Sequence, residues 1–255
     1  MPQRLSNVKP NAKGIMFDKL AGPGRNRPEL AQLAAQVISE WSLLDTYFSG
    51  LFVAMLGANP RPGAAVYANF TATLTQAQAM RTVGKLTLDA VLYDMLDTLL
   101  TLYKSRGTER NRVGHWVWGY TPDLPDKALL VEPSHFSVYH ADFITWETAV
   151  MRDTNSQLKQ PGIRLEHVWV YGQKDFADIS ERIQRLIELT GRFRNLVRAH
   201  LLLAVGGAKT VQFAARLNAL LREPEFRACV DRLNARHQKS QEAPEQPPPE
   251  SLPQK

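Results

Sequence analysis

An arginine, an asparagine and a histidine fall within six residues in the stretch "ERNRVGHWVWGY", residues 109–120. Arg110 carries a fixed positive charge on a planar set of donors, which suits a phosphate group. His115 is the kind of side chain that best moves a proton near neutral pH. The two together can hold a phosphodiester and assist attack on it. RNA supplies its own nucleophile, the 2′-hydroxyl, so we expect this chemistry to need no metal and no cofactor.

The cluster closes a helix that hydrophobic periodicity predicts from Leu88 to about Trp116, with Gly107 as a tolerated weak point. At 100° per residue, His115 lies about 40° from Asn111 and about 20° from Lys104, so these three share a polar stripe.

Arg110 falls instead in line with Tyr103 and Leu99, at the margin of the apolar face. The arginine is therefore expected to point toward whatever the helix packs against, and the histidine toward the neighbouring groove. Two further arginines, Arg106 and Arg112, are candidates for additional phosphate contacts.

Two more long helices are predicted before this one. Pro28 suits a first helical turn, and apolar residues then recur at steps of three and four through Leu30, Leu33, Val37, Trp41, Leu44, Phe48, Leu51 and Met55. After the break "GANPRPG", the same period predicts a second helix through Val66, Tyr67, Phe70, Leu74, Ala77, Met80 and Val83. Short connections make antiparallel neighbours the expectation for residues 28–116.

The pattern changes after Gly119. The segments "KALLVEP", "HFSVYH" and "IRLEHVWVYG" are short, rich in β-branched or aromatic residues and partly alternating, which predicts strands, with a helix over "FITWETAVMRDTNSQL". From Asp178 a helical stripe runs to Leu201, "Gly206-Gly207" breaks it, and two shorter helices follow at about 210–222 and 225–237.

The expected fold is mainly α: an antiparallel helical bundle with a small β insertion and additional C-terminal helices. Its predicted parts are a flexible basic arm, one helical domain and a disordered tail rich in Pro, Gln and Glu. The arm covers residues 1–26, the domain 27–237 and the tail 238–255; within the domain, the bundle core is 28–120, the β insertion about 121–172 and the C-terminal helices 176–237.

Composition limits the function classes. The formal net charge is +6, with balances of +4 over residues 1–30, −3 over 121–175 and +6 over 176–239, which favours phosphate-bearing partners weakly. The single cysteine, Cys229, excludes an internal disulfide framework and a cysteine-rich zinc site. No apolar run is long enough to span a membrane, and residues 1–20 lack the apolar core of a signal peptide, so we expect a cytoplasmic protein.

The pattern Arg110-Asn111-x-x-x-His115, at the end of the third helix of an α-bundle, resembles the motif of the HEPN superfamily. The first helix, with "VISEWSLLDTYFSGLFVAMLG", also resembles the opening of bacterial HEPN-like proteins, and the similarity covers roughly residues 28–120. The resemblance implies a metal-independent endoribonuclease that acts as a homodimer, often in a toxin–antitoxin or defence role, with an antitoxin or other regulatory protein as a further partner.

Carried over residue by residue, the resemblance implies that Arg110 binds the scissile phosphate and that His115 acts as general base or acid. Asn111 would hold the imidazole or the phosphate. Apart from the resemblance, Lys104, Arg106 and Arg112 are candidates for further contacts with RNA. A toxin subgroup has a tyrosine two residues after the histidine, which a nucleotidyltransferase modifies. This chain has Val117 there, so the resemblance does not support control by that modification.

Several alternatives stay open. Arg110 and His115 can simply be cations at a helix C-terminus, where they favour the helix dipole; the chain would then be a catalytically inactive HEPN-like binding or scaffold protein, or an RNA-binding module without cleavage. A second match, "RNLVRAH" at 194–200, has its arginine and histidine about 120° apart, and a solvated basic face with Arg182, Arg185 and Arg192 explains it.

Other candidate groups are interpreted as structural. His135 and His140 are expected on opposite faces of a strand, which argues against a metal site with Asp142. Glu40 and Asp45 lie about 140° apart on one helix, which argues against an acid pair. Trp116 and Trp118 are expected to pack a corner between a helix and a strand.

Overall fold

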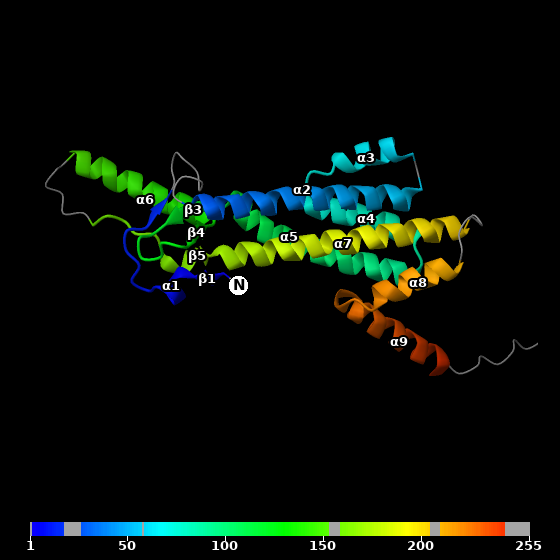
Figure 1. Cartoon of the computed structure of the whole chain (residues 1–255). Helices are drawn as coiled ribbons and strands as arrows, with labels where there is room; N and C mark the ends of the chain where they lie inside the picture. Colours follow the sequence, from blue (N-terminus) through cyan, green and yellow to red (C-terminus); the bar gives the residue numbers. More distant parts are fainter. Residues whose placement is uncertain (1, 18–26, 58, 153–158, 205–209, 243–255) are drawn as a thin grey trace, which may run out of the picture.

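The computed structural model describes residues 2–17, 27–57, 59–152, 159–204 and 210–242. Over these residues the protein is mainly helical, with one small antiparallel sheet at one end of a helical bundle (Figure 1). Three long helices form the bundle: α2 (Pro28–Leu56), α5 (Ala90–His115) and α7 (Gln173–Ala204). The predicted first helix is confirmed and begins at Pro28 as expected. The predicted third helix is also confirmed, and its two ends lie within two residues of the predicted ones.

Shorter helices surround this core: α3 (Pro60–Ala68), α4 (Thr73–Thr87), α8 (Thr210–Leu221) and α9 (Arg227–Glu242), the last preceded by a 3₁₀ turn, η2 (Pro224–Phe226). The apolar stripes that the sequence shows on α2, α5 and α7 meet in one cluster of buried side chains. Their burial is the main favourable contribution to folding.

The helices α2 and α7 make the most extensive contact in the fold and run side by side along their length (Figure 1). They are parallel, because Gln173 contacts Glu29 at their first turns while Gly191 contacts Tyr47 further along. A parallel pair follows from the connection: α7 starts at the sheet, where α2 also starts, so the chain enters both helices from the same end.

The sheet has the strand order β1-β5-β4-β3-β2, with every neighbouring pair antiparallel. Its strands are β1 (Gln3–Arg4), β2 (Met16–Phe17), β3 (Val117–Tyr120), β4 (Ala128–Val131) and β5 (Val168–Tyr171). The central strand β4 is buried along its whole length. The short helix α1 (Leu5–Val8) buries Leu5 in a second apolar cluster on this sheet.

The segment before α2 differs from the predicted flexible arm. Its two short strands pair with β5 and β3, so residues 3–4 and 16–17 form the two outer edges of the sheet. Residues 18–26 lie outside the described residues. A strand of two residues is too short to show alternation of polar and apolar residues. Its partner strand is also more than a hundred residues away, so the local sequence does not predict the pairing.

The segment "HFSVYH" is helical, which corrects the prediction of a strand. It belongs to α6 (Pro133–Arg152), which also contains the part of the predicted helix "FITWETAVMR" that the structure describes. Pro133 opens this helix, and Phe136, Tyr139, Phe143 and Trp146 recur at helical spacing and form a ladder of ring contacts. The aromatic content mimics a strand, whereas the spacing and the proline indicate a helix.

Four further boundaries differ from the sequence-based expectation. The predicted second helix is divided into α3 and α4 by residues 69–72, and β3 begins inside the predicted bundle core at Val117. The predicted strand at 163–172 is shorter, because a 3₁₀ turn, η1 (Leu165–His167), precedes β5. Helix α9 reaches Glu242, beyond the predicted start of the tail at 238. The predicted break at Gly206-Gly207 and residues 243–255 lie outside the described residues.

Among the residues that the structure describes, no helix is long and apolar enough to cross a membrane.

Candidate functional site

The candidate residues lie in the last two turns of α5, which is fixed at both ends. The Asp89 side chain caps the start of the helix by accepting a hydrogen bond from Leu92 N at 2.9 Å. At the other end, the chain passes directly into β3, and the buried Trp118 indole donates to the Val113 carbonyl at 3.2 Å. This hydrogen bond holds the last turn of α5 against the sheet.

The helix α5 packs closely against α2 before its last two turns. A Cβ atom at Gly107 would lie 3.1 Å from the Trp41 ring of α2. Gly107 therefore allows a close approach of α5 to α2, which explains a glycine in a helix interior despite its cost in helix propensity.

Arg110 and His115 contact each other directly. The Arg110 Nη1 atom lies 2.9 Å from His115 Nε2 and donates to Asn111 Oδ1 at 3.1 Å. A guanidinium can only donate, so a hydrogen bond between the first pair requires His115 Nε2 to accept and places the imidazole proton on Nδ1. Arg110 is half-buried, and its Nε is buried without a hydrogen-bond partner among the described residues.

These three residues line one end of an open groove of about 870 Å³ between α2, the connection from α3 to α4, and α5. The volume lies in the range of small-ligand sites in proteins. Its other lining residues are Trp41, Ser42, Asp45, Thr46, Ser49, Tyr67, Ala68, Phe70, Thr71, Ala72, Thr73 and Gln76. The break between α3 and α4, which the sequence did not reveal, therefore forms one wall of the groove.

A polar network lies in the floor of the same groove. The buried Tyr103 hydroxyl donates to Asp45 Oδ1 and lies 2.8 Å from Gln76 Oε1. Burial, with the negative charge of Asp45 beside them, raises the pKa of Tyr103 and of Tyr67 above the ordinary tyrosine range. Both phenols are therefore protonated at neutral pH.

The remaining predicted RNA contacts are divided between two sides of α5. Lys104 is exposed and lines a neighbouring groove together with Asn111. Arg106 lies on the opposite side, where it pairs with Glu109, a carboxylate that also pairs with Arg182 of α7.

Arg112 also faces away from the groove. Its guanidinium lies over the rings of Trp116 and Trp169, 5.4 and 5.2 Å from their centroids. The structure thus brings together Arg110, Asn111 and His115, with Lys104 adjacent, and does not bring Arg106 or Arg112 to them.

The second arginine–histidine match does not form a cluster. The Arg194 guanidinium packs against Gly50 and lies over the Tyr47 ring at 5.3 Å, whereas His200 lies 3.8 Å from Asp89 and contacts the Phe213 ring. The two side chains have different surroundings, as their angular separation predicted.

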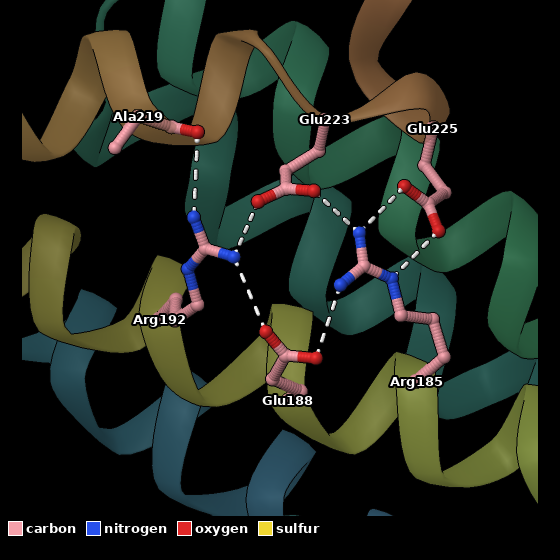
Figure 2. A network of polar contacts seen from close by, with 6 residues as sticks. All are labelled: Arg185, Glu188, Arg192, Ala219, Glu223 and Glu225. Atoms are coloured by element: carbon pink, nitrogen blue, oxygen red, sulfur yellow. Dashed lines mark hydrogen bonds and ion pairs between the residues drawn. The ribbon is translucent and has the colours of Figure 1, made fainter.

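Arg182, Arg185 and Arg192 of α7 are paired with carboxylates, which corrects the expectation of a solvated basic face. Arg185 and Arg192 form a network with Glu188 of the same helix and with Glu223 and Glu225, which follow α8 (Figure 2). Carboxylates from a distant part of the sequence neutralise these arginines, so the charge of this segment is not a free basic patch.

The other candidate groups take structural positions. His135 stacks on His167 with ring centroids 3.7 Å apart, and His140 stacks on Phe136; within the described residues, no group of three potential metal ligands occurs. Trp118 stacks on Phe176, and Trp116 contacts Trp169, so both tryptophans pack at the corner between α5 and the sheet, as predicted.

Glu40 and Asp45 do not form an acid pair, also as predicted. Glu40 accepts from Ser180 and Gln184 of α7, whereas Asp45 contacts Tyr103 in the groove. Tyr67 and Gln76 carry no signal of a site in the sequence, because they come from separate helices and no spacing relates them to Arg110.

Comparison with protein-family models, with curated proteins and with solved structures found no match to this chain.

Proposed function

We propose that this protein is a metal-independent endoribonuclease of HEPN type that cuts RNA by attack of the 2′-hydroxyl on the neighbouring phosphate. The observation that carries the proposal is the contact of Arg110 Nη1 with His115 Nε2 at one end of an open groove. A fixed cation and a group that moves protons are thus within reach of the same phosphate.

Each residue has a defined task in this reaction. Arg110 donates to the phosphate oxygens and stabilises the charge that builds on them, using its unpartnered Nε together with Nη1. His115 Nε2, which carries a lone pair in the tautomer that Arg110 favours, takes the proton from the 2′-hydroxyl. The 2′-oxygen then bonds to phosphorus and the bond from phosphorus to the 5′-oxygen breaks. The protonated His115 returns its proton to the 5′-oxygen, and a cyclic 2′,3′-phosphate remains.

Asn111 and Lys104 assist binding in this proposal. Asn111 accepts from Arg110 and so orients the guanidinium, and Lys104 lies in the adjoining groove, where it can contact the RNA backbone beyond the scissile phosphate. Arg106 and Arg112 are engaged with Glu109 and with tryptophan rings, so we assign them no part in catalysis.

The assembly expected from the resemblance is a homodimer in the cytoplasm, held in check by an antitoxin or other regulatory protein. The helical bundle with its motif at the end of α5 supports the HEPN-like assignment. The exposed position of His115 and Asn111 supports access by a large substrate.

A second candidate function is a catalytically inactive HEPN-like binding or scaffold protein. One observation favours it: Arg110 already contacts both Asn111 and His115, at 3.1 and 2.9 Å. In that case the cluster stabilises the end of α5 and performs no chemistry.

Cleavage of total RNA by the purified full chain, with a metal chelator present, separates the two. We expect cleavage that leaves cyclic or 3′-phosphate ends, and a loss of roughly 100-fold or more in Arg110→Ala and in His115→Ala. The matched controls are Arg198→Ala and His200→Ala, which alter an exposed arginine and the histidine of the second match outside the groove. Equal activity in wild type and both groove variants would overturn the nuclease proposal.

A further inference from the structure

The Asp45 carboxylate gives the groove a hydrogen-bond acceptor that is only partly used. A phenol has a single proton, so Tyr103 can donate to only one of its two neighbours, and Asp45, which only accepts, takes it. The second carboxylate oxygen of Asp45 has no hydrogen-bond partner among the described residues. The half-buried Asp45 lines the groove, so this oxygen is available to a ligand that brings its own donors.

The Tyr67 hydroxyl lies beside this carboxylate and beside the Tyr103 hydroxyl. Tyr67 is 4% exposed, and its hydroxyl is buried without a partner of hydrogen-bond geometry among the described residues. A buried hydroxyl that lacks a partner is costly, and native structures usually satisfy such groups with protein, water or ligand. Tyr67 lines the same groove, so a ligand acceptor placed there would satisfy it.

Aromatic surface completes this end of the groove. Trp41 and Tyr103 are buried and stack on each other, with ring centroids 4.8 Å apart and 7° between the ring planes, whereas the half-buried Phe70 of the α3–α4 connection offers ring surface to the groove. Flat aromatic surfaces near a phosphate-binding cation are typical of sites that hold an unstacked base.

We propose that Asp45, Tyr67 and the surrounding aromatic rings form a guanine-binding subsite that selects the nucleotide next to the phosphate held by Arg110. The proposal rests on the proposed function for the phosphate end, but the base site is defined by different residues. In it, the Asp45 carboxylate accepts from the N1–H and 2-amino groups of guanine, and the Tyr67 hydroxyl donates to O6.

Guanine is the base whose edge fits this arrangement. It presents two adjacent donors followed by an acceptor, whereas adenine and cytosine each place a ring-nitrogen acceptor beside their amino group, which a carboxylate repels. Uracil offers one donor between two carbonyl groups. A carboxylate with a neighbouring phenol therefore discriminates in favour of guanine without any backbone contact.

Equilibrium binding of mononucleotides to the full chain tests the subsite independently of cleavage. With calorimetry, we expect GMP to bind roughly tenfold more tightly than AMP. IMP, which lacks the 2-amino group, should lie between them. Equal affinity for GMP and AMP, or no binding of GMP at millimolar concentration, would overturn the proposal.

Two variants identify the residues. Asp45→Asn replaces one acceptor by a donor and should abolish the preference for GMP, while its amide oxygen can still accept from Tyr103. Tyr67→Phe should reduce the preference without a loss of folding, because its hydroxyl has no partner to lose. The matched control is Glu40→Gln, the same change on the same helix facing α7, which should leave the preference intact. A preference for GMP that persists in Asp45→Asn would exclude this carboxylate as the reader.

Cleavage mapping separates failure of this proposal from failure of the nuclease proposal. If the wild type cuts next to guanosine and Asp45→Asn cuts next to all four nucleotides, both proposals are supported. Cleavage by wild type without base preference keeps the nuclease and overturns the subsite. A GMP preference in a protein that cleaves nothing keeps the subsite and overturns the nuclease.

Discussion

At the scale of single residues, the hydrogen-bonding groups of the site have few protons and lone pairs, and most of these are already engaged. The lone proton of Tyr103 is committed to Asp45, the lone pair of His115 Nε2 faces Arg110, and Tyr67 has no partner. Two tyrosines that look equivalent in burial therefore differ in what their hydroxyls contribute to the free energy of unfolding.

Tyr103→Phe and Tyr67→Phe should have opposite consequences for stability. The first removes the hydrogen bond to Asp45 and leaves this half-buried carboxylate without its donor, so we expect a loss of about 1–3 kcal/mol. The second removes a buried hydroxyl that makes no hydrogen bond and should change stability by less than about 0.5 kcal/mol, or raise it. Urea unfolding of the two variants beside wild type measures both; a larger loss for Tyr67→Phe than for Tyr103→Phe would contradict the assignment.

The sequence could predict the phosphate end of the groove but not its floor. Arg110, Asn111 and His115 lie on one helix, so the helical angle between them follows from their spacing. Asp45, Gln76 and Tyr103 meet from three helices, and only the packing of α2, α4 and α5 brings them together. No spacing in the sequence predicts a contact between residues of three different helices.

At the scale of elements, long amphipathic helices and the four-residue strands β4 and β5 were predictable, and the two-residue strands β1 and β2 were not. The stripes of α2 and α5 each extend over several turns, so that the period of 3.6 residues is evident. The strands β1 and β2 have two residues each, too few to show alternation, and their partners are distant in sequence. The aromatic residues of α6 predicted a strand from composition, but their helical spacing and Pro133 at the first turn are typical of the helix that the structure has.

Gly119 shows how closely two of these strands approach. A Cβ atom at this position would lie 2.7 Å from the Met16 carbonyl oxygen, which belongs to the backbone and cannot rotate away. We expect Gly119→Ala to displace β2 and to destabilise the protein by about 1–3 kcal/mol, with faster amide exchange in β2 and β3 but not in α2. Gly162→Ala, where nothing lies within 4 Å of the added atom, is the control and should have no such effect in the same exchange experiment.

The ion-pair network of Figure 2 joins α7 to the residues after α8, and its contribution depends on pH. The guanidinium groups of Arg185 and Arg192 hold the pKa of Glu223 below its ordinary value of 4.5. The lowered pKa means that this stabilisation is present above pH 4.5 and is lost as the pH falls toward the lowered value.

Glu223→Gln should therefore destabilise the protein by about 1 kcal/mol at neutral pH and should cost progressively less below about pH 4. Urea unfolding of wild type and variant across this range is the measurement. Glu147→Gln, on the exposed face of α6, serves as the control. A difference between wild type and Glu223→Gln that stays constant with pH would show that the network contributes nothing through charge.

At the scale of the whole molecule, the formal net charge of +6 does not show where the unpaired positive charge lies. The arginines of α7 in Figure 2 are matched by carboxylates. The groove cations Arg110 and Lys104 have no carboxylate partner among the described residues. A charge count along the sequence could not distinguish the two groups, because the neutralising glutamates are about 30–40 residues away from their arginines.

We therefore expect only a few phosphate contacts to determine how the affinity for RNA depends on salt concentration. We expect the affinity for a short RNA to fall as salt rises, and Arg110→Ala to reduce the slope of log affinity against log salt concentration by about 1. Arg198→Ala, outside the groove, should leave the slope unchanged. Fluorescence anisotropy in a salt series measures this, and an equal reduction in both variants would indicate a diffuse rather than a local phosphate contact.

The two edge strands at residues 3–4 and 16–17 also bear on how the molecule is assembled. Strand β1 pairs with β5, and the helices α2 to α6 are all synthesised between them. Pairing over so much chain is slow to form, so the bundle around α2 and α5 should collapse before the sheet closes. Until then the edge of β5 that pairs with β1 stays open and is available to other chains. Completion of this sheet is thus the step of biosynthesis at which we expect misassociation to compete with folding.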